Sequence, residues 1–167
     1  MRIAARLATL ALAATLAGCG FQLRGPATFP FKSIAVPGQS TLLTELQRNI
    51  ASGSNAKLVT RTEDAEAIFA VLGEAREKVI LSLNTQGRVR EFQLRYRLLY
   101  RVHDGKGGDY IAPTELVLRR DITFNDQVLA KENEEAILFR EMQSDMVQQL
   151  IRRMQAAKLR RPGDEDE

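Results

Sequence analysis

The clearest pattern in the chain is an alternation of apolar and polar residues between positions 92 and 102. The apolar positions are Phe92, Leu94, Tyr96, Leu98, Tyr100 and Val102. Most of the intervening positions are arginine or glutamine. A period of two is typical of a strand that buries one face. The segment therefore predicts a long β-strand with a core face and a cationic outer face.

Two flanking segments repeat this period and are predicted to pair with the central strand as a meander. Residues 67–83 place a second apolar set on one face, and Gly73 and Glu77 interrupt it in a way that indicates a β-bulge. That set is Phe69, Val71, Ala75, Val79, Leu81 and Leu83. The turn that follows closes a hairpin, with Gly87 free to adopt a positive φ. Residues 115–124 alternate again after a second glycine-rich turn.

The first helical pattern lies before this meander. After a short strand at residues 32–36, Ser40 or Thr41 can cap a helix that ends near Gly53. Its apolar side consists of Leu42, Leu43, Leu46 and Ile50. Residues 56–60 are a candidate for one more short strand. Because this helix has one apolar side, it is expected to pack against the sheet.

A longer helix is predicted for residues 133–157, with acidic residues at its start and basic residues at its end, as the helix dipole favours. Its broad apolar stripe is made of Leu138, Phe139, Met142, Met146, Val147, Leu150, Ile151 and Met154. Together the patterns predict an α+β fold. In this fold two helices pack on one face of a mostly antiparallel, roughly four-stranded sheet.

The N-terminus has the layout of a secretory signal. Arg2 and Arg6 precede an apolar run at residues 7–16 that is too short to span a bilayer as an ordinary helix. The run ends in Leu16-Ala17-Gly18-Cys19, which resembles the bacterial lipobox. That resemblance implies that a signal peptide of residues 1–18 is removed and that Cys19 is lipidated.

Lipidation also explains the single cysteine of the chain. Three acyl chains on Cys19 would hold the protein on a membrane permanently, whereas one chain binds only marginally. Gly20, where an aspartate would retain such a lipoprotein at the inner membrane, implies transfer to the periplasmic side of the outer membrane. The alternative is a soluble secreted domain with a free thiol, which is disfavoured because an exposed thiol is a liability in an oxidising compartment.

The remaining length fits one domain. Residues 19–31 contain glycine and two prolines and are expected to be an extended lipidated tether. Residues 32–160 form the predicted domain, and residues 161–167 a disordered acidic tail. Without its signal the chain carries 22 Lys and Arg against 21 Asp and Glu, so no nucleic-acid partner is expected.

Enzyme chemistry is difficult to place on this sequence. His103 is the only histidine and has no second histidine or thiol with which to bind a metal. The chain contains no Gly-x-Ser-x-Gly turn, phosphate-binding loop or dinucleotide motif. We expect no catalytic residues, no metal and no cofactor.

The remaining pattern that could serve in binding is a row of arginines. Arg95, Arg97, Arg101 and Arg119 are predicted on the outer face of the sheet, and Arg88 and Arg90 lie near the hairpin tip. The row has two interpretations: a solvated sheet face, or a rigid surface that presents guanidinium groups to phosphates or to partner carboxylates.

Three segments together resemble the LptE family of lipopolysaccharide (LPS)-assembly lipoproteins. They are residues 19–25, the hairpin run Glu91-Phe92-Gln93-Leu94, and residues 129–134, which lead into a helix containing Glu141-Met142. The resemblance implies an α+β domain that plugs the large outer-membrane barrel LptD. It also implies a role in assembling that barrel and in delivering lipopolysaccharide to the cell surface, without enzyme activity.

The resemblance carries over to few residues. Lys131 matches a basic position before the last helix that the family associates with lipopolysaccharide binding. Relatives place an arginine before the turn glycine, where this chain has Thr85, and its own Arg88 and Arg90 follow Gly87. We predict lipopolysaccharide contacts at Lys131, Arg88 and Arg90. The predicted interface with the barrel is Gly87, Arg95, Arg97, Arg101 and Arg119.

Two other functions remain open at this point. One is a pilot or scaffold lipoprotein for a different outer-membrane complex, without lipopolysaccharide binding. The other is an envelope hydrolase, which the scarcity of catalytic motifs makes remote.

Overall fold

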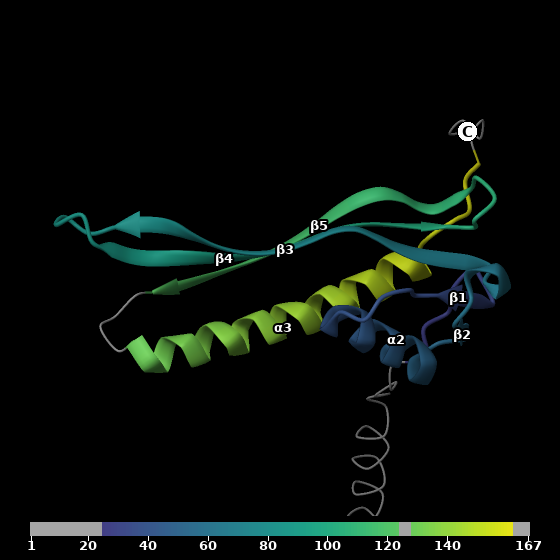
Figure 1. Cartoon of the computed structure of the whole chain (residues 1–167), viewed down its shortest axis with the longest axis horizontal. Coiled ribbons are helices and arrows are strands. Elements are labelled where there is room, and N and C mark those ends of the chain that lie inside the picture. The colour runs from purple at the N-terminus through teal and green to yellow at the C-terminus, as the bar shows by residue number, and fades with distance from the viewer. Residues whose placement is uncertain (1–24, 124–127, 162–167) are drawn as a thin grey trace, which may run out of the picture.

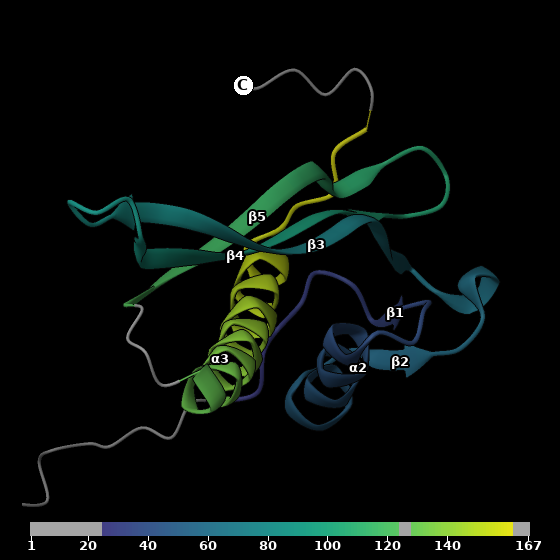
Figure 2. The ribbon, with the colours of Figure 1, turned by 60° about the vertical axis from the view of Figure 1, so that its left-hand side comes forward.

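A single sheet with two helices on one side forms the body of the molecule. The computed structural model describes residues 25–123 and 128–161. Helix α2 (Thr41–Gly53) lies next to the short strands at one end of the sheet, and helix α3 (Val128–Gln155) runs beneath the long strands (Figure 1, Figure 2). The two helices also pack against each other. Within the described residues, no helix covers the opposite face of the sheet.

The sheet has five strands in the order β2-β1-β3-β4-β5. Their bounds are β1 Ser33–Ala35, β2 Lys57–Val59, β3 Ala67–Leu83, β4 Val89–His103 and β5 Asp109–Thr123. Strand β1 pairs in parallel with both β2 and β3, whereas β3, β4 and β5 form an antiparallel meander. The prediction of roughly four mostly antiparallel strands was therefore close but incomplete. Helix α2 is the crossover that a parallel β1–β2 pair requires.

The β1–α2–β2 unit agrees with its sequence pattern. Ser40 caps α2, because its side chain accepts a hydrogen bond from the Leu43 amide at 3.3 Å. The apolar side of the helix, Leu42, Leu43, Leu46 and Ile50, is buried. A short 3-10 turn, η1 (Thr62–Asp64), then leads into β3.

The segment before β1 packs into the core. Phe29 and Phe31 are buried and their rings stack at 5.2 Å, although the sequence placed them in the tether. The side chain of Asn55 holds this segment by bonding both the amide and the carbonyl of Phe29, at 2.8 and 3.2 Å. Ala27 forms an isolated bridge with Ser54. The packed part of the chain thus begins before residue 32.

Strand β4 follows its predicted alternation, and the core-facing positions from Leu94 to Val102 are buried. In β3 the prediction was wrong beyond Val71. A bulge at Leu72 shifts the register, so that Glu74 pairs with Leu98 and faces the helices. Because one extra residue inverts the alternation, the later apolar positions of β3 leave the core. Two further register shifts follow between Ile80 and Leu83, and Leu81 and Leu83 in this irregular part are 46% and 55% exposed.

Helix α3 starts five residues earlier than predicted. From Asn133 onward, where its side chains are described, the buried apolar residues of the helix are Met142, Met146, Val147, Leu150, Ile151 and Met154. Leu138 and Phe139 are only half-buried, and the helix diverges from the sheet toward its N-terminal end (Figure 1). Among the described residues, neither helix combines the length and hydrophobicity needed to cross a bilayer.

Candidate functional site

The outer face of the sheet carries the arginine row, but with acidic residues between the arginines. Arg95 pairs in register with Glu77 on β3 and with Arg119 on β5. The Arg97 guanidinium lies 2.7 Å from Glu115 and 3.4 Å from Glu77. The hydrogen bond to Glu115 and the negative charge of both carboxylates raise the pKa of Arg97. The predicted cationic face is therefore a face of mixed charge.

Two other members of the row also have polar partners. The Arg95 Nε donates to Gln93 at 2.8 Å, and Gln93 in turn donates to Asp121 at 2.9 Å. Arg101 forms an ion pair with Asp109 at 2.8 Å, near the opposite end of β4 from the hairpin turn. Within the row, Arg97 and Arg101 are thus paired with carboxylates, whereas Arg95 bonds a neutral amide.

The hairpin tip between β3 and β4 projects beyond the body of the molecule (Figure 1). Gly87 takes a φ of +75°, as predicted, and its amide donates to the Asn84 carbonyl at 3.0 Å. Arg88 and Arg90 are exposed here. Ile80, next to the tip, is 58% exposed. The tip therefore combines basic and apolar side chains.

Lys131 lies in the first turn of α3, and only its backbone is described. The start of α3 and the hairpin tip occupy the same end of the molecule (Figure 1). The fold thus brings the elements that carry Lys131, Arg88 and Arg90 to one end. The arginines of the outer face lie along the middle and far parts of β4 and β5. Cys19 lies outside the described residues.

Sequence reasoning missed three cations on the helix-facing side of the sheet: Arg76, Lys78 and Arg120. The Lys78 ammonium lies 2.6 Å from Glu135 of α3, and the Arg120 guanidinium lies 2.6 Å from Asp145. We call the polar contact between this side of the sheet and α3 from Glu135 to Asp145 the seam. The sequence does contain a sign of the seam: Glu74, Arg76 and Lys78 are charged and lie two positions apart, which is the spacing of residues on one face of a strand.

A polar network extends the seam into the core. Arg76 donates to the hydroxyl of buried Tyr96 at 3.2 Å and to Gln143 at 3.0 Å. The Tyr96 hydroxyl donates to Glu74 at 2.6 Å. Burial, followed by the bond to Glu74, raises the pKa of Tyr96 to about 12. Gln143 donates to Glu45 at 2.7 Å and thereby links α3 to α2.

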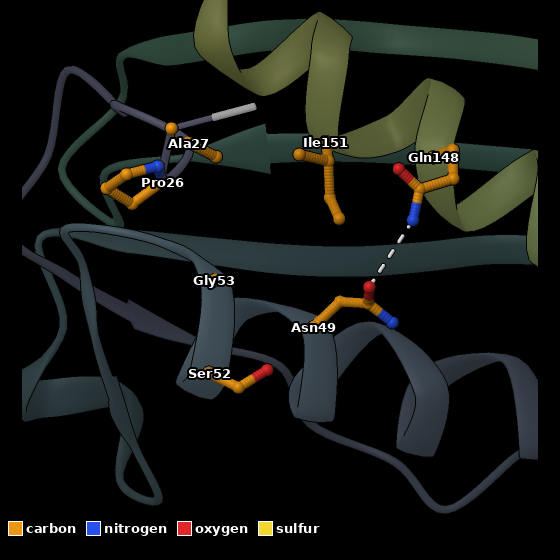
Figure 3. A pocket seen from close by; sticks show the side chains of 8 residues that line it. Pro26, Ala27, Asn49, Ser52, Gly53, Gln148 and Ile151 are labelled. Atoms are coloured by element: carbon orange, nitrogen blue, oxygen red, sulfur yellow. Dashed lines mark hydrogen bonds between the residues drawn. The ribbon is translucent and has the colours of Figure 1, made fainter. Parts of the chain in front are cut away.

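The pockets of the described residues differ in their chemistry. An open pocket of about 370 Å³ is lined mostly by titratable side chains: Glu63, Asp64, Glu66, Asp104, Lys106, Tyr110 and Arg161, with Ala65 and Leu159. One open pocket of about 340 Å³ lies between the N-terminal segment, α2 and α3 (Figure 3). It is lined by Gly25, Pro26, Ala27, Asn49, Ser52, Gly53, Gln148 and Ile151. None of these side chains titrates near neutral pH. Gln148 donates to Asn49 across one side of the pocket at 3.3 Å.

The single histidine lies in a turn and away from this pocket. His103 Nδ1 accepts a hydrogen bond from the Gly105 amide at 3.1 Å. Burial, together with the positive charge of Arg101, lowers its pKa. Within the described part of the chain, no three His, Cys, Asp or Glu residues are grouped as metal ligands would be.

Three solved structures that are similar to this chain are named as lipoproteins. An uncharacterized lipoprotein B from Nitrosomonas europaea, solved by NMR, is 40% identical with a TM-score of 0.68, covering 80% of this chain and 88% of that one. The rare lipoprotein B from Shewanella oneidensis is 25% identical with a TM-score of 0.63, covering 75% and 95%. A minor lipoprotein from Acinetobacter baumannii, 20% identical with a TM-score of 0.64 and covering 80% and 99%, shares the fold.

The fold thus places the chain in the class of α+β domains to which these structures belong. The model of the LptE lipopolysaccharide-assembly family matches residues 31–154. The chain belongs to this family, which confirms the resemblance seen in the sequence. A search of curated proteins found no significant match.

Proposed function

We propose that this protein is an outer-membrane lipoprotein that plugs the LptD barrel, assists its assembly and takes part in transport of lipopolysaccharide to the cell surface. The observation that supports this most is the family match, which covers nearly the whole folded part of the chain. The protein acts by binding and carries out no catalysis. The pocket between the N-terminal segment, α2 and α3 is lined by no titratable side chain.

The outer face of the sheet is the proposed contact with the barrel. It has no helix over it among the described residues, and Arg95, Arg97 and Arg119 alternate on it with carboxylates. A flat surface of mixed charge is complementary to a polar barrel lumen, where each partner can offer both signs of charge. Arg101 and the turn at Gly87 extend this contact toward the two ends of β4.

The basic residues at the end of the molecule are the proposed contacts with lipopolysaccharide. Arg88 and Arg90 are exposed at the tip, and Lys131 begins the neighbouring helix. Arginine binds phosphate groups through forked, charge-assisted hydrogen bonds, which are about twice as strong as neutral ones. Lipopolysaccharide supplies such phosphates on lipid A and the core sugars.

The proposed anchor is the acylated Cys19, exposed after removal of residues 1–18 as a signal peptide. Gly20 supports delivery to the outer membrane on the periplasmic side. The lipoprotein names of the structural relatives support the anchor as well.

Affinity purification from membranes in mild detergent tests the proposed partner. The tagged full chain should copurify with a large outer-membrane barrel of the LptD type, identified by mass spectrometry. Recovery of a secretin-type ring, or of no barrel, would instead support the pilot or scaffold alternative. Intact-mass analysis of the same sample should show Cys19 carrying acyl chains, and a Cys19→Ser variant should lack them.

Charge reversal tests the lipopolysaccharide contacts. The double variant Arg88→Glu, Lys131→Glu should weaken lipopolysaccharide binding about tenfold or more, because two attractive phosphate contacts become repulsive. The matched control is Arg48→Glu, Lys57→Glu, which changes the charge equally at exposed sites on α2 and β2. Unchanged binding in the first variant would discard the ligand role of these residues but leave the role as a plug.

A further inference from the structure

The pocket between α2 and α3 lies where the described part of the chain begins (Figure 3). Gly25 and Pro26 form part of its wall. The next residue, Ala27, is fixed to the body, because its amide donates to the Gly53 carbonyl at 2.7 Å and its carbonyl accepts from the Asn55 amide at 3.0 Å. The position of Gly25 in the wall is therefore set by the fold. The residues that precede Gly25 start from this pocket.

The pocket has open space at the point where those residues would enter it. A Cβ atom added to Gly25 or to Gly53 would meet no heavy atom within 4 Å, apart from the adjacent residues of the chain and the backbone of the helix itself. The pocket volume of about 340 Å³ is near the lower end of the range for binding pockets in proteins. A short stretch of peptide with one apolar side chain suits a pocket of this size better than a large ligand does.

The chemistry of the pocket wall matches a peptide backbone. Asn49 and Gln148 carry primary amides, and Gln148 donates to Asn49 at 3.3 Å across one side of the pocket. Together with the hydroxyl of Ser52, these groups both donate and accept hydrogen bonds, as the amide groups of an extended chain do. Ile151 adds an apolar surface. Because no lining side chain is charged, the pocket is suited to a neutral, partly apolar occupant.

The sequence directly before Gly25 offers such an occupant. Phe21, Gln22, Leu23 and Arg24 alternate between apolar and polar side chains. In an extended chain alternate side chains point to opposite sides, and two residues span about 7 Å. From the pocket wall at Gly25, the side chain of Leu23 can therefore reach the pocket, while Gln22 and Arg24 would point the other way, toward solvent.

We propose that this pocket binds the chain's own residues 21–24, with Leu23 against Ile151 and the backbone at the amides beside it. The covalent link favours this occupant, because a segment tethered at the pocket wall has an effective concentration on the order of millimolar, which a separate peptide would have to exceed. An anchor at Cys19 would then lie two residues from a segment fixed between the C-terminal ends of α2 and α3. These ends of the helices would face the membrane. The inference goes beyond the proposed function and needs neither the barrel nor lipopolysaccharide.

The accessibility of an introduced thiol tests this placement. The full chain carrying Cys19→Ser has no other cysteine, so Leu23→Cys or Gln22→Cys places one thiol at a chosen position. The rate of reaction with a water-soluble maleimide is measured in mild detergent. The thiol of Leu23→Cys should react about tenfold or more slowly than that of Gln22→Cys, because reaction requires access to the sulfur atom. In urea at a denaturing concentration, the two rates should become equal.

Filling the pocket provides the matched comparison. Gly53→Leu places a side chain in the open space, and the φ of Gly53 is not among the positive values, so that a leucine fits the backbone there. In this background the two thiols should react at the same rate. The control Ala51→Leu adds the same bulk at an exposed position of α2 outside the pocket and should preserve the difference. Circular dichroism reports folding, and Ser52→Trp is the second filling variant if Gly53→Leu does not fold.

Three results would overturn the proposal. The first is an equal reaction rate of the two thiols in the folded chain with an unfilled pocket. The second is protection of residue 23 that persists in a folded filling variant, since the protection then arises elsewhere, for example in the detergent micelle. The third is protection that weakens on dilution, because the segment of a second copy then occupies the pocket. None of these results affects the proposed function, which copurification with the barrel tests separately.

Discussion

Tyr96 connects the sheet to both helices through a single hydroxyl group. The hydroxyl donates to Glu74 and accepts from Arg76, while its ring is fully buried. Arg76 continues to Gln143, and Gln143 to Glu45. A hydroxyl between an anion and a cation is satisfied in both of its hydrogen-bonding roles. Loss of the hydroxyl group would leave Glu74 and Arg76 without their hydrogen bonds to Tyr96.

We expect Tyr96→Phe to lower the free energy of unfolding by about 1–2 kcal/mol, as for a lost hydrogen bond to charged groups. Urea unfolding followed by circular dichroism measures the change. The matched control is Tyr100→Phe, since the Tyr100 hydroxyl is also buried but contacts no carboxylate and has only the Arg153 guanidinium near it. That control should stay within about 0.5 kcal/mol of the unchanged chain. Equal losses in the two variants would contradict the role assigned to Tyr96.

At the scale of elements, the bulge in β3 determines which chemistry faces the helices. Before Leu72 the strand buries Phe69, and after it the strand turns Glu74 and Lys78 toward the helix side. The extra residue thereby creates the polar seam and exposes the apolar positions near the tip. The number of residues at this point matters more than the identity of the bulged side chain.

Deleting Leu72 should therefore be far more damaging than truncating it. We expect the deletion to cost at least about 3 kcal/mol of unfolding free energy, because it misplaces every later β3 side chain. Leu72→Ala should cost less than about 1 kcal/mol, since the side chain is 49% exposed. Chemical denaturation compares the two variants. A tolerated deletion would show that the register is fixed elsewhere.

Long periodic elements could be predicted from the sequence, whereas relations between elements could not. The alternation of β4 and the stripe of α3 identify these elements because each pattern repeats many times. Strands of three residues such as β1 and β2 carry no period, so their parallel pairing was missed. The acidic partners of Arg97 depend on the register of two neighbouring strands, which one sequence does not contain.

The candidate site was predictable to a similar extent. The basic positions at Arg88, Arg90 and Lys131 were identified from composition and family resemblance, and their contact with lipopolysaccharide stays a prediction. The seam was missed because the bulge was recognised without its consequence for the charged positions that follow it. When a strand contains a one-residue irregularity, either alternate set of the residues that follow it has to be considered as the core-facing set.

At the scale of the whole molecule, the N-terminal segment belongs to the folded body. Phe29 and Phe31 join the core, and Phe31 also contacts Tyr110 of β5 edge to face at 5.2 Å. The segment therefore ties the first residues of the body to the last strand of the meander. Full burial of one such side chain stabilises a protein by about 1.5–3 kcal/mol.

A chain that begins at Gly25 should be clearly more stable than one that begins at Lys32. The shorter chain loses both phenylalanines, and we expect it to melt about 10 °C lower, on a scale of about 4 °C per kcal/mol, where the ranges for small and larger domains meet. Thermal unfolding followed by circular dichroism measures the difference. Phe29→Ala in the longer chain should account for part of it. Equal melting temperatures would show that the segment packs without stabilising the body.

Backbone hydrogen bonds to Gly53 and Asn55 fix Ala27 to the folded body. If Cys19 is the lipid-bearing residue, only the eight peptide steps from Cys19 to Ala27 separate the bilayer from the rigid body. A fully stretched chain of that length reaches roughly 26–29 Å. Ala27 would then lie no farther than this from the membrane surface, so a partner of the folded body has to be accessible within the same narrow layer of the periplasm.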